Sequence, residues 1–165
     1  MLTKRCLRWL LGNLAEQDDL SPLRVAYACV VHAHEALTEQ AIVPKASSLV
    51  ALLAVGNYLF HSGGVEACRL AALLDPGRSF YANTVAEAFD LATYHLVVSA
   101  TCQDTQRQEC LTVCLREACA AASCVRNDKW QRPEEVWQTK RLVDAAISKP
   151  LAVGLRGRPS LLTRI

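Results

Sequence analysis

The stretch TVAEAFDLATYHLVVSAT, residues 84–101, decides the fold class. Its first residues include Thr84 and Glu87, which have the spacing of a capping box. In that motif each side chain accepts a hydrogen bond from the other residue's backbone N–H at the start of a helix. The β-prone run Leu96-Val97-Val98 lies inside the longer helical pattern. We therefore predict a helix from 85 to about 101 and no strand.

Helical patterns also occupy the chain on both sides of this stretch. Ser21 and Pro22 suit the N-cap and the first position of a helix, and Thr105 with Gln108 repeats the capping pattern. Ser62-Gly63-Gly64 is expected to end a helix, because glycine accepts the left-handed conformation found there. The further predicted helices cover residues 3–14, 21–40, 45–61, 65–74, 106–125 and 133–149.

These patterns predict an all-α fold, a compact bundle of six to seven short helices packed as antiparallel hairpins. Residues 45–61 are apolar nearly all round, so we expect this helix to be central and buried. The length of 165 residues fits one domain. We place a single helical domain in residues 1–150 and an irregular basic tail in residues 151–165.

Composition and charge exclude some broad classes of protein. The chain is 52% hydrophobic and 21% charged with a net charge of +2, which is unlike a disordered chain. Two basic ends flank an acidic middle, because the first fifteen residues and residues 145–165 contain no Asp or Glu. Neither end has the dense Lys/Arg run that phosphate binding needs, so we do not expect a nucleic-acid partner.

The sequence also argues against a membrane span and a secreted framework. The longest apolar stretch, Leu49–Phe60, has 12 residues, and a bilayer needs about 20. Arg8 interrupts the first apolar run, which disfavours a secretory signal. The eight cysteines mostly lie within helical patterns and are expected to be reduced, packed thiols. We predict a cytoplasmic location, and the basic N-terminus leaves organelle targeting open.

Cysteines on one helix face form the main alternative site. At 100° per residue, Cys110, Cys114 and Cys124 fall within about 80° of one another, whereas Cys119 points to the opposite side. Three thiols on one face suit a soft metal ion. The Cys-x-x-x-Cys pair is similar to the pattern of helical copper-storage proteins, although thiols are not repeated densely on every helix here. This resemblance implies a thiol-based metal-binding or redox protein.

Catalytic signatures are weak. His32 and His34 are two residues apart and face about 200° away from each other on a helix, so they cannot chelate one ion together. No Gly-rich phosphate loop is present, and we expect no cofactor. An enzyme with a cysteine nucleophile is a weaker alternative, because a Cys/His pair can meet in space without any local motif.

The leading hypothesis is a non-enzymatic protein–protein interaction module, such as an adaptor, a chaperone, or an inhibitor or immunity-type binder. One segment resembles a tetratricopeptide-type helix pair through Leu53-Ala54-x-x-x-Tyr58, Ser62-Gly63, Glu66-Ala67 and Leu74-Asp75-Pro76. Its second helix is about a turn too short for that family, and no second copy follows. The resemblance implies helix-hairpin packing and partner binding. The candidate binding surface consists of Trp130, Trp137, Arg156 and Arg158. Exposed aromatic residues mark binding surfaces, although Trp130 and Trp137 could equally pin the last helix to the body. The expected partner is another protein, and a homo-oligomer is left open.

Overall fold

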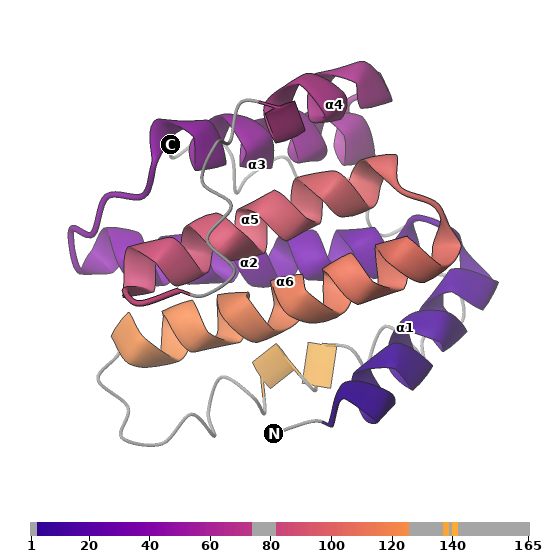
Figure 1. Cartoon of the computed structure of the whole chain (residues 1–165), viewed down its shortest axis with the longest axis horizontal. Helices are drawn as coiled ribbons and strands as arrows, with labels where there is room; N and C mark the ends of the chain where they lie inside the picture. Colours follow the sequence, from indigo (N-terminus) through magenta and orange to yellow (C-terminus); the bar gives the residue numbers. More distant parts are fainter. Residues whose placement is uncertain (1–2, 74–81, 126–136, 139, 142–165) are drawn as a thin grey trace.

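The computed structural model describes residues 3–73, 82–125, 137, 138, 140 and 141, apart from the side chain of Asp104. This part of the chain contains six helices and no strand, and the helices pack together as shown in Figure 1. The all-α prediction is therefore confirmed. The helices are α1 (Lys4–Gln17), α2 (Ser21–Glu39), α3 (Ala46–Phe60), α4 (Val65–Leu73), α5 (Val85–Thr101) and α6 (Asp104–Val125).

The predicted capping box at the start of α5 is confirmed. The N–H of Glu87 donates to Thr84 Oγ1 at 3.2 Å, and the N–H of Thr84 donates to Glu87 Oε2 at 3.2 Å. Glu87 Oε2 also accepts from the N–H of Asn83 at 2.7 Å. These bonds satisfy N–H groups that have no partner within the helix, so this short motif fixes where α5 begins.

Two other predicted helix starts are displaced. The helix after α5 begins at Asp104, so Thr105 lies inside α6 and is not its N-cap. The N-cap of α2 is Leu20, and Ser21 is already the first helical residue. Asp18 does the capping: its carboxylate accepts from the N–H of Leu20 at 3.3 Å and from Ser21 Oγ at 3.2 Å. A carboxylate three residues upstream therefore replaces the predicted serine cap.

The turn between α3 and α4 also differs from the prediction. Ser62 adopts the left-handed conformation with φ 56°, whereas none of the described glycines has a positive φ. Gly63 is required for space, because a Cβ there would lie 2.9 Å from the backbone carbon of Asn57. The N–H of Gly63 donates to the Asn57 carbonyl oxygen at 3.0 Å. Close approach, and not backbone handedness, explains this glycine.

The helix at the centre of the bundle is α5, and not α3. Four other helices, α2, α3, α4 and α6, pack against α5, as Figure 1 shows. Its buried hydroxyl groups bond back to its own backbone: Thr93 Oγ1 donates to the Phe89 carbonyl at 2.9 Å, and Ser99 Oγ donates to the Leu96 carbonyl at 2.6 Å. These two buried hydroxyl groups are therefore satisfied within their own helix.

The prediction that residues 45–61 form a central, fully buried helix is wrong. One side of α3 faces α5 and buries Leu52, Val55 and Leu59. The opposite side is in contact with solvent although it too is apolar, with Val50 47% and Leu53 44% exposed. An all-apolar helix was expected to be surrounded by other helices, but the described part of the chain covers only one side of it.

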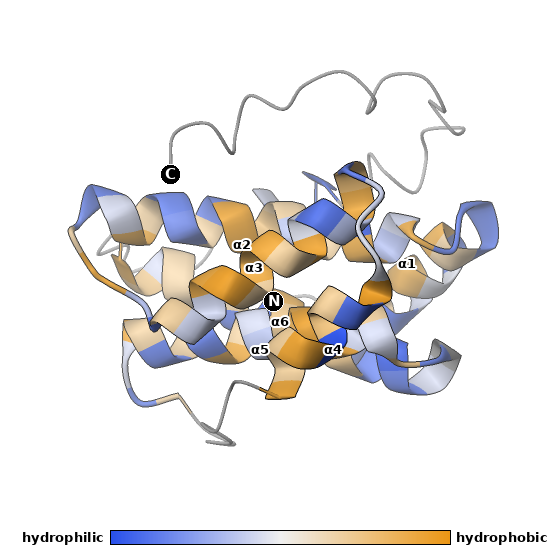
Figure 2. Cartoon of the chain, turned by 90° about the horizontal axis from the view of Figure 1, so that it is seen from above, coloured by the Kyte–Doolittle hydropathy of each residue, from blue (hydrophilic) through white to orange (hydrophobic). Residues whose placement is uncertain are grey.

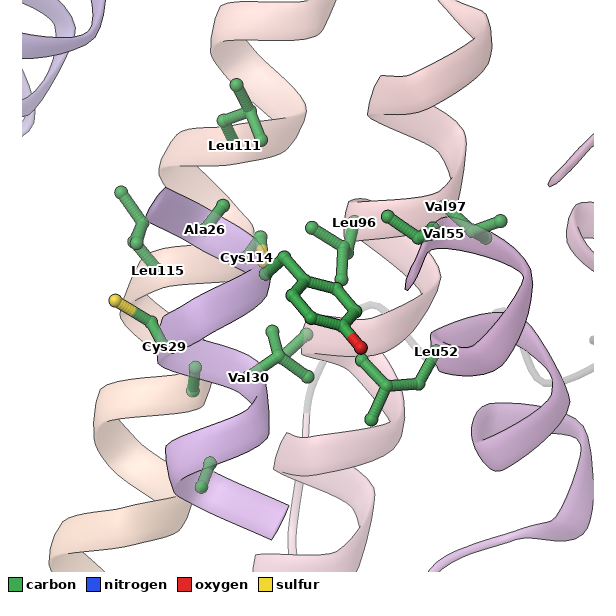
Figure 3. Packing of buried hydrophobic residues seen from close by; sticks show 14 of the residues in the cluster. Ala26, Cys29, Val30, Leu52, Val55, Leu96, Val97, Leu111, Cys114 and Leu115 are labelled. Carbon is green, nitrogen blue, oxygen red and sulfur yellow. The ribbon is translucent and has the colours of Figure 1, made fainter. Parts of the chain in front are cut away.

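The core joins α2, α3, α5 and α6 through small and branched side chains (Figure 3). Leu52 and Val55 of α3 lie toward Leu96 and Val97 of α5, and Cys114 of α6 belongs to the same buried cluster. No helix in the described part is long and apolar enough to cross a membrane.

Candidate functional site

Trp137 is the only residue of the predicted binding surface that falls within the described part of the chain. Trp130, Arg156 and Arg158 lie outside it. The indole of Trp137 is half-buried and stacks on the imidazole of His32 in α2, with ring centroids 4.0 Å apart and planes 12° apart. The guanidinium of Arg141 lies 5.1 Å from the centroid of the Trp137 ring. The indole thus packs against the body of the bundle on the face that meets α2.

The neighbouring Gln138 is buried and hydrogen-bonds to α6. With the amide oriented so that both of its ends are satisfied, its Nε2 donates to the Leu115 carbonyl at 3.2 Å and its Oε1 accepts from the N–H of Cys119 at 3.1 Å. Two successive side chains, Trp137 and Gln138, therefore contact α2 and α6. The alternative in which Trp137 packs against the body agrees with these contacts.

The three cysteines of the predicted metal site are not brought together. Cys110 and Cys114 are buried, whereas Cys124 is exposed. Ten residues separate Cys124 from Cys114, which corresponds to about 15 Å along the helix axis. A shared helix face therefore does not place the three sulfurs around one ion. Within the described residues, no three His, Cys, Asp or Glu side chains are grouped to hold a metal ion.

A different set of thiols is close together. Cys110 interacts with Cys102, the residue that caps the C-terminus of α5, and Cys114 lies near both Cys110 and Cys29 of α2. Burial, with smaller effects from Cys102 and Glu109, raises the pKa of Cys110 to about 11. Burial also raises the pKa of Cys114 well above its ordinary value. These thiols are protonated at neutral pH, which disfavours both metal binding and nucleophilic attack.

The contacts of the histidines indicate a role in packing more clearly than a role in catalysis. His34, predicted on the inner stripe of α2, is half-buried with its ring centroid 5.6 Å from that of Phe89. Burial lowers the pKa of His34 and of His95. The buried Nδ1 of His95 has no hydrogen-bond partner among the described residues. His61 is exposed.

Asp90 is a buried carboxylate with a structural role that the sequence did not reveal. It projects from α5 to the start of α3, where its Oδ1 accepts from Ser48 Oγ at 2.6 Å and from the N–H of Lys45 at 3.2 Å. A negative charge at a helix N-terminus is favourable because of the helix dipole. Asp90 therefore caps α3 from a neighbouring helix, a contact 45 residues away in sequence that no local pattern could indicate.

The most distinctive surface feature is apolar and lies on α3 and α4. In the described residues, six of the seven large hydrophobic side chains that are exposed fall between Val43 and Leu73. We define the apolar face as Val50, Leu53 and Phe60 of α3 with Leu70 and Leu73 of α4. Figure 2 looks down on this side of the bundle and shows hydrophobic segments along it.

The five residues of the apolar face are all well exposed. Val50, Leu53 and Phe60 are between 42% and 47% exposed, and Leu70 and Leu73 are 63% and 80% exposed. The two helices pack against each other, and residues 46–60 contain no charged side chain. The signal in the sequence was the run of apolar residues at 45–61. We interpreted that run as a helix buried on all sides.

No protein-family model, no curated protein and no solved structure matches this chain.

Proposed function

We propose that the chain is a non-enzymatic protein–protein interaction module, of the adaptor, chaperone or inhibitor type, that binds through the apolar face of α3 and α4. The observation that carries this proposal is the clustering of exposed hydrophobic side chains on these two helices. Contiguous exposed apolar surface is costly in water and marks sites that another protein covers. The partner is therefore a protein with an apolar surface of its own.

The packing of the described thiols and imidazoles supports this proposal. The buried thiols are protonated, as the raised pKa values of Cys110 and Cys114 indicate. The rings of His34 and His32 pack on Phe89 and Trp137. A cytoplasmic location belongs to the same proposal, because a reducing compartment keeps buried thiols such as Cys68 and Cys114 unoxidised.

A thiol-based metal or redox function is the second candidate, because Cys114 lies near Cys29 and Cys110, although these described residues are not grouped around a site that could hold an ion. Titration with Cu(I), read by the number of thiols that stay reactive, separates the two functions. The interaction proposal predicts no change in thiol reactivity that saturates at a fixed ratio of metal to protein. Stoichiometric protection of the three thiols would instead support the metal-binding function.

Site-specific photo-crosslinking tests the interaction proposal directly. A photoreactive amino acid replaces Leu53 on the apolar face or, as the control, Trp9 on α1, which is 66% exposed. We expect discrete protein adducts from position 53 that disappear when Leu70→Glu is introduced, and no such adducts from position 9. Equal, diffuse adducts from both positions would contradict the proposal.

A further inference from the structure

The exposed residues of α3 follow a heptad pattern. They are Ala46, Val50, Leu53, Asn57 and Phe60, and every other described residue of this helix is buried or half-buried. The spacings of four, three, four and three residues are those of the a and d positions of a coiled coil. The outward side of α3 is thus a narrow apolar seam two heptads long, with one polar residue in it.

Such a seam is self-complementary. A two-fold axis brings the same patch of both copies together, so a charged residue near the axis, or anywhere along a parallel helix pair, would face a like charge. Residues 46–60 contain no charged side chain. On the adjoining helix, Glu66 and Arg69 form an ion pair, so α4 adds no net charge from this pair beside the seam.

Asn57 indicates how two copies are oriented. In a parallel pair with matched register, Asn57 of each chain faces its counterpart, and the two amides can hydrogen-bond to each other. In an antiparallel pair Asn57 would face apolar residues and bury an amide without a partner, which is unfavourable. A single polar residue in the seam therefore favours the parallel, in-register arrangement.

The exposed apolar area supplies the larger part of what a dimer interface needs. At their exposed fractions, the five residues of the apolar face present on the order of 500 Å² per chain, compared with about 800 Å² per partner in a standard interface. The rest of a standard interface would come from residues beside the seam. A patch of this size is at the upper end of what a monomer leaves exposed to water.

We propose that two copies of this chain pair through the α3 seam about a two-fold axis, with α3 parallel to α3 and Asn57 facing Asn57. The inference rests on the proposed function, since it names a second copy as the protein that covers the apolar face. Leu70 and Leu73 of α4 flank the seam and are covered in the same dimer.

Sedimentation equilibrium of the full chain and three variants tests this dimer. Leu53→Glu places a charge opposite its own copy and is expected to weaken dimerisation more than tenfold. Asn57→Leu replaces the polar residue of the seam and is expected to tighten it, because an apolar residue at such a position is more stable than Asn. Trp9→Glu, the control on α1, is expected to leave the dissociation constant unchanged.

The variant Asn57→Leu guards against a trivial result, because unfolding cannot tighten a dimer. If the dimer persists in Leu53→Glu, or if Asn57→Leu weakens it, the proposed pairing through the α3 seam is wrong. If the chain is monomeric at every concentration, a second copy is not the partner that covers the apolar face. If position 53 then still crosslinks to a different protein, the proposed function stands. If it crosslinks to nothing, both proposals fail.

Discussion

Gly56 of α3 lies so close to Tyr27 of α2 that a Cβ at position 56 would be 2.6 Å from Tyr27 Oη. The phenol fills the space that a side chain at position 56 would occupy. Its buried hydroxyl has no hydrogen-bond partner within the described residues. The contact between α2 and α3 therefore requires a residue without a side chain at position 56. It also leaves the Tyr27 hydroxyl without an acceptor among the described residues.

This contact predicts a stabilising substitution. Tyr27→Phe removes the buried hydroxyl and is expected to raise the free energy of unfolding by about 1 kcal/mol. Gly56→Ala is expected to lower it by about 1–3 kcal/mol through overpacking, and by less in the Tyr27→Phe background. Urea denaturation of the two single variants and the double variant measures this coupling. Strict additivity would contradict the contact.

The carboxylate of Asp90 is expected to be one of the main polar contributions to stability. Asp90→Ala removes the acceptor for Ser48 Oγ and the Lys45 N–H, and we expect it to lower the free energy of unfolding by about 2–3 kcal/mol. Asp90→Asn keeps one acceptor oxygen and should cost less. Glu16→Ala, an exposed acid on α1, is the control. Equal small losses from all three variants in urea would show that Asp90 does not cap α3.

Stability is expected to fall as the pH drops below about 6.5 because of buried imidazoles. Burial lowers the pKa of His34 and His95 from 6.5 in the folded chain. The unfolded chain consequently binds more protons in this range, and protonation favours unfolding. The difference between the urea midpoints measured above and below this pH should be smaller in His95→Gln than in the unchanged protein. The exposed His61 supplies the control variant, and an equal effect from His61→Gln would contradict the assignment.

Thiol alkylation separates packing cysteines from reactive ones. Under native conditions near neutral pH, iodoacetamide should label the exposed Cys6 and Cys124 first. Cys68, Cys110 and Cys114 should react slowly because burial both raises the pKa of each thiol and blocks access to it. Mass spectrometry of digested samples gives the rate at each site. Labelling of Cys110 as fast as that of Cys6 would favour a thiol-based function.

The sequence predicted local structure well where a few adjacent residues determine it. The Thr84–Glu87 capping box is such a case, because both partners lie within one helical turn. Asp18 was missed as the cap of α2, although it is just as local, because serine and proline at positions 21 and 22 gave a stronger signal one residue too late. Helix limits at this level can be read from propensity and capping alone.

Three-dimensional placement was harder to predict. Hydrophobicity cannot tell a helix that is surrounded by its own chain from one that keeps an apolar side for another molecule, so α3 was placed at the centre instead of α5. Angular position alone grouped Cys124 with Cys114, because a helical wheel ignores the rise along the axis. Long-range contacts such as that of Asp90 with Ser48 leave no trace in a single sequence.

The central claim, that the outward side of α3 is a protein interface between two copies, is tested most directly by ¹⁹F NMR on chain labelled with 4-fluorophenylalanine. Phe60 is 42% exposed on the seam, and Phe89 is fully buried in the core. Over a dilution series, the account predicts that the Phe60 resonance moves with concentration while that of Phe89 stays fixed. A Phe60 resonance that is constant from the most dilute to the most concentrated sample would contradict it.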